Sequence, residues 1–338
     1  MLDRRVKIGR LVSGGLITTY ACTSACRHCL YNSGPRREKR YIDPAIAEEH
    51  LRLVRSLGCA VVHIGGGEPM LRPEGLGAVL DAARLAGVSV DYVETNAAWF
   101  ADAESAAVLL SELRARGLHT LLVSISPFHN EHIPFGRTRG VMDAAARAGV
   151  RVFPWVAEFV ADLSGFDPSR PHALVEYEKR FGKDYLSGIL RRYWIHLGGR
   201  ALETFRPMLR ARTLEHVLRE QPEDCSRELG DTSHFHVDLF GNYIPGLCAG
   251  LAVACEDLGR PLAKETYPLL TRLFAKGIRG FYEMAAADFG FRPSREGYIG
   301  KCDLCTDIRR FLVSRGYDRS SELSPEGFYS RHPDPGAA

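Results

Sequence analysis

Several features that would assign this chain to a special class of protein are missing. The sequence holds no run of about eighteen apolar residues, so no membrane span is expected. Its first residues, 1–7, lack the apolar core of a signal peptide. The 44 Lys and Arg residues nearly balance the 41 Asp and Glu residues, and the net charge of +3 does not by itself indicate a nucleic-acid partner. We therefore expect a cytoplasmic protein with no membrane or nucleic-acid partner.

Short repeats of fixed period are also absent. The 338 residues suit one large domain, or one large and one small domain. A hydrophobic fraction of 45% and a charged fraction of 25% are ordinary for a globular protein. Composition therefore leaves the function open, and the motifs have to indicate it.

The sequence does contain nine cysteines. In a chain expected to be cytosolic, they favour metal binding or catalysis over disulfides. Cys22, Cys26 and Cys29 follow an apolar, β-prone run over 16–21 in the spacing Cys-x3-Cys-x2-Cys. Three thiolates can hold three irons of a [4Fe–4S] cluster and leave the fourth iron open. A zinc site would need a fourth ligand, and the nearest candidate, His28, lies between two of the cysteines.

A second motif, Gly66-Gly67-Glu68-Pro69, follows the apolar run 61–64. In this order, the two motifs resemble those of the radical S-adenosylmethionine (radical SAM) enzyme superfamily. The resemblance implies that the three cysteines carry the catalytic cluster, whose open iron is chelated by the amino and carboxylate groups of SAM. It also implies that Gly66, Gly67 and Glu68 receive the amino group. The alternative is a zinc loop or a redox thiol cluster beside an unrelated glycine turn.

Strand and helix patterns alternate through the first two thirds of the chain, which predicts a parallel sheet with right-handed crossovers. The expected strands are 16–21, 59–64, 88–93, 118–125, 150–156 and 193–197. The expected helices are 44–57, with Asp43 as N-cap, 73–86, 102–116, 138–148 and helical material over 168–191. The resemblance implies an α/β fold, a partial (β/α)6 TIM-like barrel. We assign 1–205 to this barrel and 206–338 to a small α+β, cysteine-rich extension.

Polar residues gather at the expected strand ends, which form the active-site rim of such a barrel. Asn96, Ser124 and Ser126 are candidates for the ribose hydroxyls and the methionyl carboxylate of SAM, and Arg200 for a carboxylate or a bound nucleoside. Each has a plainer alternative as a turn, cap or surface residue. The segment after the fourth strand adds two histidines, which are either substrate-facing groups or part of a plain loop: His129 and His132.

The last third contains a second cysteine set, namely Cys225, Cys248, Cys302 and Cys305. A β-hairpin is predicted over 234–245, with Gly241 at its turn. The arrangement resembles the twitch extension of some radical SAM enzymes, a short relative of the SPASM domain, which implies an auxiliary [4Fe–4S] cluster. One departure is that six residues, not four, separate Gly241 from Cys248. Four thiolates also suit zinc.

Three further features of this region lead to expectations. Cys255 could replace Cys248 as a ligand, but we expect it to be a thiol that packs against a helix. Cys59 is expected to be buried. His234 and His236 alternate with apolar residues and should share one outer face of the hairpin. The expected helices are 262–276, 278–288 and 307–313.

The resemblance implies that SAM is cleaved reductively to methionine and a 5′-deoxyadenosyl radical, which abstracts hydrogen from a substrate. The substrate is a small metabolite or a peptide, and the electron comes from a flavodoxin- or ferredoxin-type reductant. The auxiliary cluster would serve electron transfer or structure. Two alternatives stay open: a zinc-binding interaction protein, and an iron–sulfur electron-transfer protein without SAM chemistry.

Overall fold

The computed structural model describes residues 6–220, 225–317 and 320–330. Its centre is one eight-stranded sheet in the order β5-β4-β3-β2-β1-β6-β7-β8. Neighbours from β5 to β6 are parallel, and the last two pairs are antiparallel. The strands are β1 Gly14–Ile17, β2 Val61–Gly65, β3 Ser89–Thr95, β4 Thr120–Val123, β5 Arg151–Pro154, β6 Phe235–Asp238, β7 Asn242–Ile244 and β8 Val253–Ala254.

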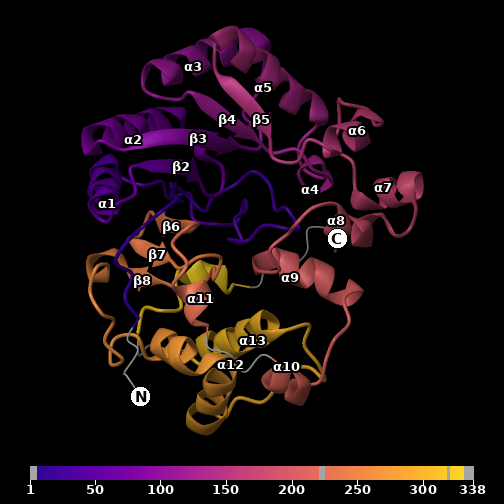
Figure 1. Ribbon diagram of the computed structural model, residues 1–338. Coiled ribbons are helices and arrows are strands. Elements are labelled where there is room, and N and C mark those ends of the chain that lie inside the picture. The colour runs from indigo at the N-terminus through magenta and orange to yellow at the C-terminus, as the bar shows by residue number, and fades with distance from the viewer. Residues whose placement is uncertain (1–5, 221–224, 318–319, 331–338) are drawn as a thin grey trace.

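Four helices cover the outer side of the first five strands (Figure 1). They are α1 Pro44–Ser56, α2 Pro73–Ala86, α3 Ala103–Ala115 and α5 Phe135–Ala148. Local sequence sets their ends: the Asp43 carboxylate accepts a 2.8 Å hydrogen bond from the Ala45 N–H, which confirms the predicted N-cap. α2 and α5 end where Gly87 and Gly149 adopt left-handed backbone angles, with φ of 69° at both.

The remaining helices are shorter or lie in the last third. They are α4 Pro127–Asn130, α6 Phe159–Ser164, α7 Leu174–Phe181, α8 Tyr185–Arg192, α9 Gly199–Phe205, α10 Leu214–Glu220, α11 Ser226–Leu229, α12 Pro268–Phe289 and α13 Lys301–Ser314. Single 3-10 turns occur at η1 Pro69–Leu71, η2 Arg206–Met208, η3 Cys255–Asp257 and η4 Glu326–Phe328. Gly277 has non-helical angles and divides α12 near the boundary of the two predicted helices, but the first of these begins at Pro268 and not at residue 262.

The predicted sixth barrel strand is wrong. Residues 193–197 form no strand, although their β-branched and aromatic side chains resemble one. Several of these side chains instead line the central cavity, and the backbone that follows bonds to the cysteine loop. The parallel sheet therefore has five successive strand–helix units, and not six.

The position beside β1 is taken by β6, which lies more than two hundred residues away in sequence. β1 and β6 are parallel, with Gly14 opposite Phe235 and Ile17 opposite Asp238. β6 and β7 form the predicted hairpin, whose turn includes Gly241 with φ of 80°. The last third of the chain is thus joined to the first two thirds by a continuous sheet.

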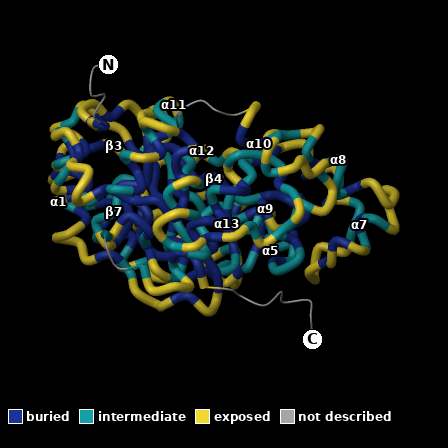
Figure 2. Tube along the Cα trace, turned by 90° about the horizontal axis from the view of Figure 1, so that it is seen from below, coloured by how far each residue is buried: buried dark blue, intermediate teal, exposed yellow. Residues whose placement is uncertain are grey.

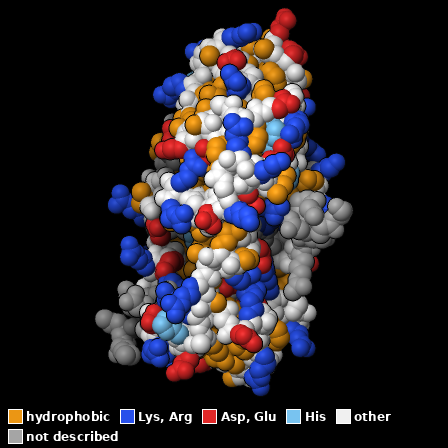
Figure 3. Space-filling view, turned by 90° about the vertical axis from the view of Figure 1, so that its right-hand side faces the viewer, with side chains coloured by type: hydrophobic (Ala, Val, Ile, Leu, Met, Phe, Trp, Pro, Cys, Tyr) orange, Lys and Arg blue, Asp and Glu red, His pale blue; other side chains and the backbone are white. Residues whose placement is uncertain are grey.

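Buried apolar side chains form one core cluster around this sheet, and Figure 2 shows the buried trace running through the centre of the molecule. Lys and Arg side chains are interspersed with Asp and Glu over the face drawn in Figure 3. No helix of the described residues is long and apolar enough to cross a membrane.

Candidate active site

A cavity of about 440 Å³ opens where the parallel strands end, the position expected for a barrel active site. Its wall includes the cysteine loop, the glycine turn, the ends of β3 and β4, and one face of β6. Side chains that reach it include Cys22, Cys26, Cys29, Tyr31, Glu94, Asn96, Ser124, Trp155, Arg200, His234 and His236. Segments that lie far apart in the sequence therefore line the same cavity.

The cysteine loop buries its thiols close together. Cys22 and Cys26 are buried, and Cys29 is partly exposed toward the cavity. Burial raises the pKa of Cys22 to about 12, and the Glu68 carboxylate raises it further. Burial also raises the pKa of Cys26, followed by the neighbouring Cys22 and Cys29. Such thiols become thiolates when a metal supplies the compensating positive charge.

Helix α9, which follows the expected sixth strand, is hydrogen-bonded to this loop. The Arg200 guanidinium donates to the carbonyls of Cys26, at 2.8 Å, and Ser33, at 2.6 Å. Its backbone N–H donates to the Cys29 carbonyl, and the Thr204 hydroxyl donates to the Arg27 carbonyl at 2.8 Å. Arg200 therefore supports the loop backbone, and its predicted contact with a carboxylate or nucleoside stays a prediction.

The glycine turn packs directly against the start of the cysteine loop. The Gly67 N–H donates to Thr19 O at 2.7 Å, and the Glu68 N–H donates to Ala21 O at 3.0 Å. A Cβ at residue 67 would overlap the Ala21 carbonyl. Glycine is therefore required here so that the two motifs can approach each other.

Glu68 joins the ends of β2 and β3. Its carboxylate is 1% exposed and accepts hydrogen bonds from Thr95 Oγ1 at 2.9 Å and the Asn96 N–H at 2.7 Å. Burial raises the pKa of Glu68 to about 7, against the lowering effect of these bonds. Its side chain does not line the cavity, whereas Gly66 and Gly67 do. Its predicted contact with an amino group stays a prediction.

The three polar candidates at strand ends lie in different surroundings. Asn96 lies next to the thiols, and its amide Nδ2 donates to Cys22 Sγ at 3.4 Å and Thr23 Oγ1 at 3.0 Å. Ser124 lines the cavity. Ser126 is fully buried, caps the short helix α4, and hydrogen-bonds the His129 ring at 2.7 Å. Ser126 thus has the cap role that the sequence left as its alternative.

His28 does not point at a shared metal position with the thiols. Its ring stacks on Phe128 and Trp155, with centroids 4.7 and 4.8 Å away. His129 packs edge-on against it, at 4.9 Å, so His129 belongs to the cavity wall. Burial lowers the pKa of both rings, to about 3 for His129.

The contact of His63 with His236, beside the cavity, was missed by sequence reasoning. His63 Nε2 lies 2.9 Å from His236 Nε2, and His236 Nδ1 lies 2.7 Å from the Tyr31 hydroxyl. The two rings meet across β1 because Gly15 has no side chain, and a Cβ there would overlap His63. His234 lies beside them at 5.0 Å from His236, so the face that the two share borders the cavity and is not an outer face. The alternation of β2 and β6 was visible in sequence, but their adjacency was not.

Glu94 is the second carboxylate of this region. It lies on β3 directly before the last residue, Thr95, and burial raises its pKa to about 7. Among the described residues its carboxylate has no hydrogen-bonding or ion-pair partner, and it lines the cavity.

The second cysteine set also comes together. Cys225 precedes α11, Cys248 follows β7, and Cys302 and Cys305 lie on the first turns of α13. Burial raises the pKa of Cys225 to about 12 and that of Cys302 to about 11, and charge on neighbouring cysteines adds to both shifts. Cys255 is buried in η3, and its charged neighbours are Asp238, Glu256 and Glu49.

Both sets suit iron–sulfur clusters by donor chemistry, since each is a group of neighbouring soft thiols. Within 6–220, 225–317 and 320–330, no three Cys, His, Asp or Glu side chains lie close enough to hold a single metal ion. The thiols of each set are therefore near one another without converging on one point. Cys59 is buried and contacts neither set, as expected.

Comparison with known proteins gives a family match for the first part of the chain. Residues 16–156 match the model of the Radical SAM superfamily. No curated protein matches the chain.

Several solved structures are similar at low identity. Native anSMEcpe with bound AdoMet is 12% identical, with a TM-score of 0.44, over 90% of this chain and 98% of that one. BtrN in complex with AdoMet and 2-DOIA is 16% identical, with a TM-score of 0.36, over 70% and 73%. Streptococcus suis SuiB bound to S-adenosylmethionine is 13% identical, with a TM-score of 0.34, over 71% of this chain and only 61% of that one.

Proposed function

We propose that this protein is an enzyme that cleaves SAM reductively and abstracts hydrogen from a substrate. The match of residues 16–156 to the Radical SAM superfamily model supports the proposal. When bound at Cys22, Cys26 and Cys29, a [4Fe–4S] cluster supplies one electron to the SAM sulfonium, which gives methionine and a 5′-deoxyadenosyl radical. A flavodoxin- or ferredoxin-type protein is the proposed electron source.

One observation carries this proposal: the cysteine loop and the glycine turn form one backbone unit at the mouth of the cavity. The two motifs are joined by the bonds from the Gly67 and Glu68 N–H groups to Thr19 and Ala21. A ligand held by the open iron would therefore lie against the glycine backbone, where no side chain blocks it.

The other residues of the site orient and shield the ligand. Asn96 donates to the Cys22 sulfur, and such hydrogen bonds influence the potential of a cluster. Arg200 holds the loop backbone, and Ser124 offers a hydroxyl to the cavity. Trp155 and Tyr193 add aromatic surface to the cavity wall, which helps to exclude water from a reactive radical.

For Cys225, Cys248, Cys302 and Cys305 we propose an auxiliary [4Fe–4S] cluster in a twitch-like extension over 206–338. Support comes from its position beside the cavity: Leu247 lines the cavity, and the next residue is Cys248. Electron exchange between substrate and this cluster would need only a short path. The substrate is proposed to be a small metabolite or a peptide segment that enters toward Glu94 and His236.

The test is anaerobic loading with iron and sulfide, followed by dithionite and SAM. We expect brown protein with roughly eight irons per chain and formation of 5′-deoxyadenosine without added substrate. Colourless protein with stoichiometric zinc would contradict the proposal. Brown protein that leaves SAM intact would favour the alternative of an electron-transfer protein.

A further inference from the structure

Beside the second cysteine set, the protein buries a positive charge. Arg309 is 6% exposed and lies on α13, one turn after Cys305 and two turns after Cys302, so the three share a helix face. A buried charge is costly unless a partner compensates it. We therefore expect an anion close to Arg309.

The hydrogen bonds of Arg309 orient it but do not neutralise it. Nη1 donates to the Ala249 carbonyl at 2.9 Å and to the Tyr329 hydroxyl at 3.1 Å, and Nη2 donates to Thr306 Oγ1 at 3.2 Å. All three acceptors are uncharged. Nε is buried and has no hydrogen-bond partner within the described part of the chain. A buried N–H without a partner points to an acceptor that the polypeptide does not supply.

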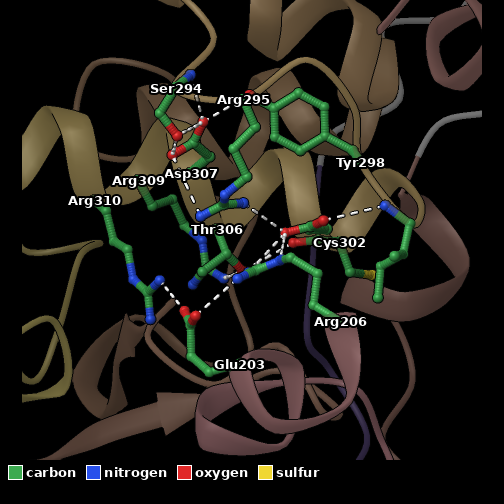
Figure 4. A network of polar contacts seen from close by, with 12 residues as sticks. Glu203, Arg206, Ser294, Arg295, Tyr298, Cys302, Thr306, Asp307, Arg309 and Arg310 are labelled. Atoms are coloured by element: carbon green, nitrogen blue, oxygen red, sulfur yellow. Dashed lines mark hydrogen bonds and ion pairs between the residues drawn. The ribbon is translucent and has the colours of Figure 1, made fainter. Parts of the chain in front are cut away.

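The neighbouring cations behave differently, as Figure 4 shows. Arg310 pairs with Glu203, and Arg206 and Arg295 both pair with Asp303 at 2.9 Å. In the described residues, Arg309 has no such carboxylate. Arg309 shares its face of α13 with Cys302 and Cys305, whose thiols become thiolates when a metal binds them.

We propose that Arg309 is the counter-ion of the auxiliary cluster and raises its reduction potential. The inference rests on the proposed function, since it requires an iron–sulfur cluster on this cysteine set. Reduction adds one negative charge to the cluster, and a fixed guanidinium at close range stabilises the reduced form more than the oxidised form. Net charge and hydrogen bonds to the sulfurs are known to set such potentials. Arg309 would thus make the second cluster a better electron acceptor.

The test isolates the second cluster. A Cys22→Ala/Cys26→Ala/Cys29→Ala variant is loaded with iron and sulfide, and its midpoint potential is measured by redox titration followed by electron paramagnetic resonance. Arg309→Gln should shift the reduced-to-oxidised ratio at a fixed potential by roughly tenfold or more toward the oxidised form, about 59 mV for one electron. Arg309→Lys should keep most of the parental potential because it keeps the charge.

Arg310→Gln is the matched control on the same helix. Its charge is already paired with Glu203, so the potential should stay at the parental value. An unchanged potential in Arg309→Gln, or an equal fall in Arg310→Gln, would overturn the inference while leaving the cluster itself in place. Loss of the cluster in Arg309→Gln but not in Arg309→Lys would support the counter-ion role, and loss in both would overturn it. A parental second set that binds no iron would instead overturn the proposed auxiliary cluster, and the inference with it.

Discussion

The two cysteine sets of this protein lie in contrasting surroundings. The first has three thiols at the edge of a cavity, and its nearby cation, Arg200, donates to backbone carbonyls. The second has four thiols, and its nearby cation, Arg309, keeps Nε unpaired. Under the proposed function, the first set keeps a coordination position open for a small ligand, and the second set only exchanges electrons.

The largest expected effect separates the two sets directly. Replacing Cys22, Cys26 and Cys29 by Ala should reduce SAM cleavage to background, because no open iron remains to bind SAM. Roughly four of eight irons should stay with the second set. Iron analysis and chromatography of 5′-deoxyadenosine check both points. Equal cleavage by the variant would show that the first set is not the catalytic one.

The reciprocal change is Cys302→Ala. It should remove the iron of the second set, while SAM cleavage without substrate continues near the parental rate. The reason is that Cys302 lies on α13, away from the cavity wall. Loss of SAM cleavage in a folded variant, judged by circular dichroism, would contradict separate roles.

Gly67→Ala tests the junction of the two motifs. The added Cβ would overlap the Ala21 carbonyl, so we expect a loss of about 2–4 kcal/mol in the free energy of unfolding and weaker SAM binding. Gly188→Ala in α8 is the control, because its Cβ would meet only Arg191 at 3.8 Å. Denaturant unfolding compares the two. A Gly67 variant as stable as the control would refute the close approach.

Arg200→Gln tests the support of the cysteine loop. Loss of the hydrogen bonds to the Cys26 and Ser33 carbonyls should cost about 1–3 kcal/mol and slow the uptake of iron by the first set only. Iron uptake in the Cys302→Ala background measures this step. An equal defect of the second set, measured in the Cys22→Ala/Cys26→Ala/Cys29→Ala background, would indicate general misfolding instead.

The smallest effect concerns pH. The pKa of Glu94 is raised to about 7 by burial, so the folded metal-free protein binds more protons than the unfolded chain between about pH 4.5 and 7. Stability should therefore fall as pH rises through this window. Glu94→Gln cannot ionise and should gain on the order of 2 kcal/mol relative to the parent between pH 4.5 and pH 8. Thermal unfolding of the variant and the parent at both pH values checks the sign of this change in stability. If the stability difference between the two proteins is the same at both pH values, Glu94 lies in a more solvated position.

Local patterns predicted much of this molecule. Asp43 and the glycines after α2 and α5 marked helix ends correctly, and the hairpin at Gly241 is present. The sixth strand failed because residues 193–197 have strand composition but no strand partner, and partners are fixed by tertiary structure. The pairing of β1 with β6 was not predictable for the same reason.

The same distinction applies to the site. Cysteine and glycine spacing identified the two motifs, because these are local. Contacts between His63 and His236 depend on two strands that flank Gly15, and no spacing along the chain encodes that adjacency. The role proposed for Arg309 could not be predicted from the sequence either, since it depends on the absence of a carboxylate partner among the described residues.

The central claim is that the first cysteine set leaves one iron open for SAM. The most direct test uses the Cys302→Ala variant, reduced with dithionite, so that only the first cluster contributes to the electron paramagnetic resonance spectrum. Addition of SAM should change the g-values of that signal, because the amino and carboxylate groups of SAM then ligate the open iron. A cluster signal that is unaffected by saturating SAM would contradict the account.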